Sequence, residues 1–117
     1  MSANRTQIGE FEELLLLAVA SLGEQAYGVA IKKTVAETTG RDPSISAVHS
    51  TMTRLEDKGF LVSRLAEPTA VRGGRRKRLF SVTASGKAAL IHAQDVRDRF
   101  RSRIPWLGGL DPNPTGA

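Results

Sequence analysis

The sequence has no cysteine, no long apolar run and fewer acidic than basic residues. The lack of cysteine excludes disulfide bonds and thiolate zinc sites, and it fits a reducing compartment. The longest apolar run, residues 14–20, is far shorter than the ~20 residues needed to cross a bilayer. Three glutamates precede this run, where a signal peptide would carry positive charge. We therefore expect a cytoplasmic protein that does not associate with membranes.

The shortage of acidic residues leaves a basic chain. Seventeen lysines and arginines stand against twelve aspartates and glutamates, which gives a formal net charge of +5. Such an excess favours a polyanionic partner, either nucleic acid or an acidic membrane surface, although a merely basic soluble protein has the same balance. The length of 117 residues suits a single domain.

Apolar spacing and local breakers divide the chain into helices and one hairpin. The expected helices span residues 8–22, 26–39, 45–58 and 84–104, and the expected strands span 60–65 and 79–82. Gly23, Gly40 and Gly59 are placed to end the first three helices, since glycine readily adopts the left-handed cap conformation. Ser44 and Thr83 are good N-caps for the third and last helices.

This order of elements predicts a mainly α-helical fold with a small two-stranded β-hairpin wing. We expect a winged helix-turn-helix over residues 8–83 and a C-terminal dimerisation helix over 84–104. Residues 105–117 are rich in Gly and Pro and are expected to form a disordered tail.

The third helix carries two different faces. Its apolar stripe is expected to lie in the core and consists of Ile45, Val48, Met52 and Leu55. The other face is polar, and it can contact bases because the major groove, about 12 Å wide, admits one helix. Its short side chains let the backbone approach the base edges, and Arg54 can reach a guanine or a phosphate. These DNA-binding candidates are Ser46, His49, Ser50, Thr53 and Arg54. The alternative is a solvated helix face without a ligand.

The predicted hairpin loop holds five cations within residues 72–78. Opposing phosphates would relieve their mutual repulsion and supply affinity that falls with salt, and two glycines would let the tip approach the backbone or a minor groove. The candidate contacts here are Arg72, Gly73, Gly74, Arg75, Arg76 and Lys77. The alternative is a solvated hairpin. The spacing of this loop differs from that of a nucleotide-binding phosphate loop.

Four segments together resemble the PadR-type transcriptional regulators, in particular the small subgroup with one C-terminal helix. They are residues 9–18 (GEFEELLLLA), 26–31 (AYGVAI), 46–59 (SAVHSTMTRLEDKG) and 73–87 (GGRRKRLFSVTASGK). The resemblance implies a homodimer that usually represses promoters, with the third helix in the major groove and the wing beside it. It also implies release by a small molecule or another signal in some members.

Two positions depart from the family pattern. The family typically has tyrosine at the position of His49 and often glycine at that of Ala47. The tyrosine tends to contact the DNA backbone. Histidine can also donate to a phosphate, but its reach is shorter and its charge depends on pH.

A lone copy of the chain would leave apolar surface on its first and last helices. We expect a two-fold partner to cover this surface, because burial stabilises by roughly 25 cal/mol per Å². The expected dimer interface contains Leu14, Leu17, Ala89, Ala93, Val96, Phe100 and Ile104. The alternative is that both helices pack within one chain.

Other groups suggest little chemistry. Phe100 and Trp106 could line a small-molecule effector pocket at the dimer interface, although such residues more often seal an interface. No histidine pair has metal-ligand spacing and no nucleophile has an evident base, so we expect no metal, no cofactor and no enzyme activity. The glutamates of the first helix are expected to form a capped, solvated face.

The sequence therefore predicts a sequence-specific DNA-binding regulator, a repressor by the resemblance, that binds an inverted-repeat operator as a homodimer. The alternative is a winged-helix module that binds protein or RNA, because a fold does not determine function.

Overall fold

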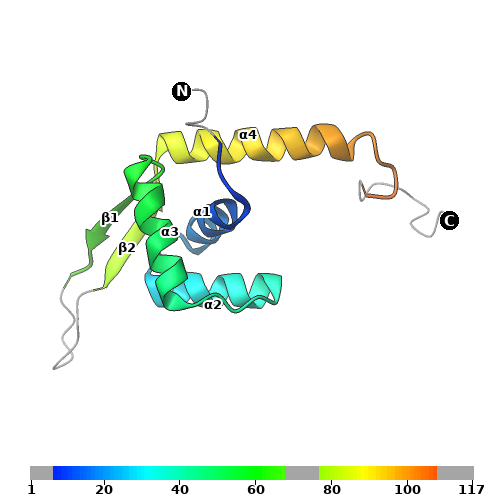
Figure 1. Ribbon diagram of the computed structural model, residues 1–117. Coiled ribbons are helices and arrows are strands. Elements are labelled where there is room, and N and C mark those ends of the chain that lie inside the picture. The colour runs from blue at the N-terminus through cyan, green and yellow to red at the C-terminus, as the bar shows by residue number, and fades with distance from the viewer. Residues whose placement is uncertain (1–6, 68–76, 108–117) are drawn as a thin grey trace.

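The computed structural model describes residues 7–67 and 77–107 and has the expected order of elements (Figure 1). The elements are α1 (Glu10–Leu22), a 3₁₀ turn η2 (Gly23–Gln25), α2 (Gly28–Thr39), α3 (Ile45–Asp57), β1 (Leu61–Leu65), β2 (Arg78–Val82) and α4 (Ala84–Arg101). The winged helix-turn-helix prediction for the fold is confirmed. The predicted hairpin tip and residues 108–117 of the predicted tail lie outside the described residues.

Local capping explains most helix boundaries. The Ser44 hydroxyl accepts a hydrogen bond from the Ala47 amide at 3.1 Å, and Thr83 accepts one from the Gly86 amide at 3.0 Å. Gly40 ends α2 with φ of 77°, in the left-handed region that favours glycine. Both N-cap predictions are confirmed.

Three helix ends differ from the sequence prediction by two residues or more, and the first is the start of α1, which lies at Glu10 and not at residue 8. Helix α2 begins at Gly28 and not near Ala26, because residues 23–25 form the short turn η2. Helix α4 ends at Arg101, before the predicted end at residue 104. The residue before a proline is disfavoured in the α conformation, so Pro105 restricts Ile104, and a turn takes up the residues between.

Helix α1 lies at the centre of the fold. Its Leu15, Leu16 and Val19 are buried, and the helix contacts α2, α3, β2 and α4 (Figure 1). The remaining core side chains come from α2, α3, the hairpin and α4, and include Ile31, Val35, Val48, Met52, Leu55, Phe60, Leu61, Phe80, Ala89 and Leu90. Because every other helix packs on α1, this helix determines how α3 and α4 are placed relative to each other.

Three expectations about burial are wrong. Ile45 is 41% exposed, because it begins α3 and lines an open groove beyond the core. Ala89 is fully buried in the core of this chain, so it is not available to a partner. Glu12 and Glu13 are only 6% exposed, because cations from α3 and α4 pair with them.

The hairpin is attached to the helical body at its base. Strands β1 and β2 pair antiparallel, with Leu61 opposite Val82 and Leu65 opposite Arg78. The Phe80 amide donates to the Ala26 carbonyl at 2.8 Å, next to a bridge between Tyr27 and Leu79. The backbone before α2 therefore extends the hairpin on the β2 side and fixes its position beside α2.

Helix α4 projects past the body that the other helices form (Figure 1). Ala89 and Leu90 in its first half are buried in the core, whereas Val96 and Phe100 in its second half are exposed. Within the part of the chain that the structure describes, no helix is long and apolar enough to span a membrane.

Candidate nucleic-acid interface

The polar face of α3 points away from the core. The buried side chains of α3 are Val48, Thr51, Met52 and Leu55, on the opposite face of the helix. All five sequence-predicted contacts on this helix are exposed, namely Ser46, His49, Ser50, Thr53 and Arg54. The helix therefore presents a polar surface of mostly short side chains to solvent.

The serines of this face keep their oxygens close to the helix backbone. The Ser46 and Ser44 hydroxyl oxygens lie 3.2 Å apart, and the Ser50 hydroxyl donates to the Ala47 carbonyl at 3.2 Å. A hydroxyl that donates in this way still has lone pairs to accept from another donor. Short hydroxyls held like this allow close approach of a base edge.

A groove joins this face of α3 to the base of the hairpin. Its lining comes from three elements that are far apart in sequence: the N-terminal end of α2, the side of α3 and the start of β2. The polar lining residues include Tyr27, His49, Thr53, Glu56, Lys77 and Arg78. The polar face of α3 and the base of the wing therefore lie on the same side of the molecule.

Polar contacts hold the hairpin base in this position. The Arg78 guanidinium donates to Ser63 Oγ at 2.9 Å, and the Ser63 hydroxyl donates to Glu56 Oε2 at 2.8 Å. The Lys77 ammonium lies 4.0 Å from the centre of the Tyr27 ring, a cation–π distance. These contacts link α3, both strands and the residue before α2. They therefore restrict movement of the hairpin base relative to the polar face of α3.

The side chain of His49 extends from α3 toward the start of α2. A methyl group added at Gly28 would meet the imidazole Cε1 of His49 at 3.4 Å. The ring therefore lies beside the first turn of α2, within van der Waals distance of a methyl group at this position.

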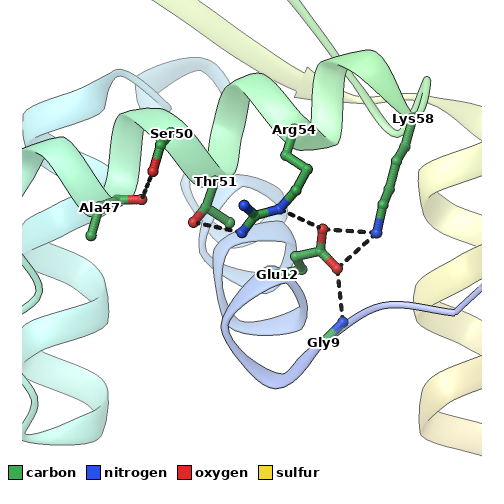
Figure 2. A network of polar contacts seen from close by, with 7 residues as sticks. All are labelled: Gly9, Glu12, Ala47, Ser50, Thr51, Arg54 and Lys58. Atoms are coloured by element: carbon green, nitrogen blue, oxygen red, sulfur yellow. Dashed lines mark hydrogen bonds and ion pairs between the residues drawn. The ribbon is translucent and has the colours of Figure 1, made fainter.

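A second polar cluster lies on the opposite flank of α3 (Figure 2). The buried Glu12 carboxylate accepts hydrogen bonds from the Lys58 ammonium at 2.8 and 2.9 Å and from Arg54 Nε at 3.4 Å. The Gly9 amide donates to it at 2.8 Å, and the Arg54 guanidinium also donates to Thr51 Oγ1 at 3.3 Å. Arg54 is therefore turned toward α1 and away from the wing.

Opposing effects act on the ionisation of Glu12. Burial raises the pKa of its carboxyl, but the hydrogen bonds from Lys58, Gly9 and Arg54 and the charge of Lys58 together leave the pKa below its usual value of 4.5. Glu12 therefore carries a negative charge at neutral pH, balanced by Arg54 of α3 and by Lys58, the C-cap of that helix.

Sequence reasoning missed two members of this candidate interface, Glu12 and Lys58, and it counted Arg78 among the loop cations without naming it as a contact. Glu12 stands three residues after the N-cap Gly9, the position of a capping-box glutamate, and that spacing could have marked it. The wing candidates Arg72, Gly73, Gly74, Arg75 and Arg76 lie outside the described residues, and their roles stay predictions.

The predicted dimer residues lie on two surfaces. Leu14 and Leu17 line a largely apolar hollow between α1 and α2, together with Ala18 and Val35. Ala93, Val96, Phe100 and Ile104 follow the outer half of α4 and the turn after it, and Phe100 is 62% exposed. Both surfaces stay candidates for a partner, with Ala89 removed.

No group of three or more histidines, aspartates and glutamates suited to a metal occurs within residues 7–67 and 77–107. In the same ranges every buried side-chain nitrogen and oxygen has a hydrogen-bond partner. The candidate binding groups that remain are the cations and hydroxyls around α3 and the hairpin base.

Solved structures share this architecture. A PadR-like transcription factor from Bacteroides fragilis is similar with a TM-score of 0.68 and 18% identity, over 88% of this chain and 92% of that one. A transcriptional regulator from Thermoplasma acidophilum has a TM-score of 0.61 at 20% identity, over 78% and 85% of the two chains. The protein hsRosR-S1, from the structure of a complex, has a TM-score of 0.59 at 21% identity, over 80% and 76%. At such identities these likenesses establish the fold.

The sequence itself supplies the family. No curated protein matches the chain in sequence. Residues 16–92, well over half of the chain, match the transcriptional regulator PadR-like family. The subgroup with a single C-terminal helix stays a prediction. The chain belongs to the PadR-like family of transcriptional regulators, which are DNA-binding winged-helix proteins and not enzymes.

Proposed function

We propose that this regulator is a sequence-specific repressor that binds an inverted-repeat operator as a homodimer. One observation carries the proposal: the exposed polar face of α3 and the basic base of the hairpin border one groove on the same side of the molecule. A duplex that receives α3 in its major groove would meet the wing at the adjacent backbone.

The two surfaces have different tasks in this proposal. Ser46, Ser50 and Thr53 contact base edges, because their short hydroxyls both donate and accept hydrogen bonds. His49 and Lys77 face the groove and contact phosphates. The wing residues Arg72, Arg75 and Arg76 add phosphate contacts, and Gly73 and Gly74 allow the tip to approach the backbone closely.

The projecting end of α4 supports the homodimer. Exposed Val96 and Phe100, together with the apolar hollow that Leu14 and Leu17 line, leave apolar surface in water. A two-fold partner that covers it stabilises both copies by roughly 25 cal/mol per Å². Such a dimer would present two copies of α3 about 34 Å apart, which is one turn of the duplex.

An effector site would form at the same interface. Phe100 and Trp106 are 62% and 75% exposed, and a partner subunit would close the space around them. We propose a small apolar or aromatic molecule as the occupant, since the two rings offer stacking surfaces. Quenching of the fluorescence of Trp106, the only tryptophan, would report binding.

Selection of bound duplexes from a random pool tests the proposal. We expect enrichment of an inverted repeat whose half-sites are centred about one helical turn apart, and repression of a reporter promoter that carries the repeat. Enrichment of a lone half-site would contradict the dimer. Absence of duplex binding at low salt would contradict the regulator and favour a module that binds protein or RNA.

A further inference from the structure

The two flanks of the exposed face of α3 are built differently. His49, Thr53 and Glu56 line the groove toward the wing, whereas Arg54 and Lys58 contact Glu12 of α1. Exposed Ser46 and Ser50 lie between the two flanks. The spacing of four residues places Arg54 and Lys58 on one side of the helix, one turn apart.

In the Glu12 cluster the cations lie closer to solvent than the anion. The side chain of Glu12 is 8% exposed, while those of Arg54 and Lys58 are 57% and 34% exposed. One carboxylate and two cations leave a net charge of +1. A polyanion that approaches this flank therefore meets positive charge first.

The dimensions of DNA give this flank a partner. A helix with its side chains is about 10–12 Å across and fills a major groove about 12 Å wide, so phosphates of the two strands border the two flanks of the helix. The wing covers one border. Phosphates along the other flank would be contacted by cations on the α1 side of the helix, where Arg54 and Lys58 lie (Figure 2).

We propose that buried Glu12 is a positioning residue that holds Arg54 and Lys58 as a phosphate-binding pair on the α1 side of α3. This inference rests on the proposed placement of α3 in the major groove. It assigns Arg54 to the DNA backbone and not to a guanine edge, and it adds Lys58, which the sequence did not suggest. Base discrimination then belongs to the hydroxyls between the flanks.

Binding of the Arg54→Ala variant to two duplexes tests the assignment. The duplexes are the sequence selected from the random pool and a random sequence of equal length. We expect the affinity for both to fall by the same factor, roughly tenfold, and the slope of log affinity against log salt to shrink by about 1. Arg99→Ala, on the exposed surface of α4, is the matched control and should change neither quantity measurably. A loss confined to the selected duplex would make Arg54 a base-contacting residue and overturn the proposal.

A double-mutant cycle with Glu12→Gln tests the positioning role. The cycle cancels the general gain in affinity that removal of a negative charge brings. If Glu12 holds Arg54 in place for the phosphate, Arg54→Ala should cost a smaller factor in the Glu12→Gln background than in the wild type. An equal or larger factor would show that Glu12 does not position Arg54. Glu12→Asp, which keeps the charge but shortens the reach, replaces Glu12→Gln in the cycle if that variant unfolds.

The outcomes separate this inference from the proposed function. If the wild type prefers the selected duplex but Arg54→Ala leaves its affinity for the random duplex unchanged, only the phosphate assignment fails. If the wild type binds no duplex, the proposed function and the inference both fail. If it binds both duplexes equally, only the sequence-specific function fails, and the loss of affinity in Arg54→Ala still decides the phosphate assignment.

Discussion

Two neighbouring glutamates of α1 face in different directions. Glu12 pairs with Lys58 at the end of α3, and Glu13 accepts from Arg97 and Gln94 of α4 at 2.5–3.1 Å. Both carboxylates are almost fully buried, and a buried carboxylate is costly unless it is paired and hydrogen-bonded. Single residues of α1 therefore connect α3, which is proposed to enter the major groove, with α4, which is proposed to form the dimer.

Glu12 should make folding sensitive to acid. Because its pKa is lowered in the folded state, its contribution is complete above the usual value of 4.5 and is lost as the pH falls through the folded-state pKa. We expect Glu12→Gln to reduce the free energy of unfolding by about 1–2 kcal/mol at neutral pH and by less near pH 3. Urea unfolding across this pH range measures the difference. A difference that stays constant with pH would contradict a charged Glu12.

Gly86 should tolerate no side chain. A Cβ at this position would lie 2.3 Å from the backbone oxygen of Phe60 and 2.7 Å from Val82 Cγ1. The first turn of α4 must therefore move, and Gly86→Ala should lower the free energy of unfolding by about 1–3 kcal/mol despite the better helix propensity of alanine. Ser85→Ala, at the exposed neighbouring position, is the control in thermal unfolding. Equal stability of both variants would contradict this close contact.

At the scale of elements, the contact between α1 and α4 depends on one ion pair as well as on Ala89 and Leu90. Arg97 donates two hydrogen bonds to buried Glu13, and hydrogen bonding to Glu13, together with the charge of that carboxylate, raises the pKa of the guanidinium. The guanidinium therefore stays charged over the working pH range. Loss of this cation would leave the Glu13 carboxylate with the neutral side-chain amide of Gln94 and without a counter-charge.

Arg97→Ala should destabilise the packing of α4 more than the substitution of a neighbouring arginine, Arg99→Ala. We expect a loss of about 1–3 kcal/mol in the free energy of unfolding, since a buried carboxylate loses its counter-charge while Arg97 itself is half exposed. Arg99→Ala breaks only an exposed pair with Asp95 and should cost less than about 0.5 kcal/mol. Hydrogen exchange of the α4 amides measures the local effect. Equal exchange in the two variants would show that the Glu13 pair does not hold α4.

At the scale of the whole molecule, the proposed dimer depends on one face of α4. Phe100→Asp should convert the dimer to a monomer, because it would place a charge among apolar side chains of the interface. Ile91 is 69% exposed, and its spacing of nine residues places it on the opposite face of α4, so Ile91→Asp is the matched control. Sedimentation velocity measures the outcome. A dimer that survives Phe100→Asp but not Ile91→Asp would locate the interface on the other face.

The accuracy of the sequence predictions depended on how local each cause was. The Ser44 and Thr83 caps and the glycine that ends α2 involve only a few consecutive residues, and their predictions were confirmed. Residues whose environment depends on distant elements were predicted less well. Ala89 was assigned to a partner but lies in the core, and Ile45 was assigned to the core but is exposed.

The candidate site divides in the same way. The exposed polar face of α3 follows from helical spacing, since a helix that buries Val48, Met52 and Leu55 must present the serines outward. The partners of Arg54 and Lys58 did not follow from spacing, because Glu12 is more than 40 residues away along the chain. The sequence left the target of Arg54 open between a guanine and a phosphate, and its pairing with α1 is the basis for proposing the phosphate.

By itself, the sequence determined the order and approximate limits of the helices and strands, the outward polar face of α3 and the basic character of the hairpin. These features arise from hydrogen bonds and apolar periods within single elements. Only the tertiary structure decided that the two glutamates of α1 are buried and that α3 and the hairpin base share one groove. Both features arise because segments that are distant in sequence pack on α1. The spacing of residues within α1 does not determine which distant cation will lie beside each glutamate.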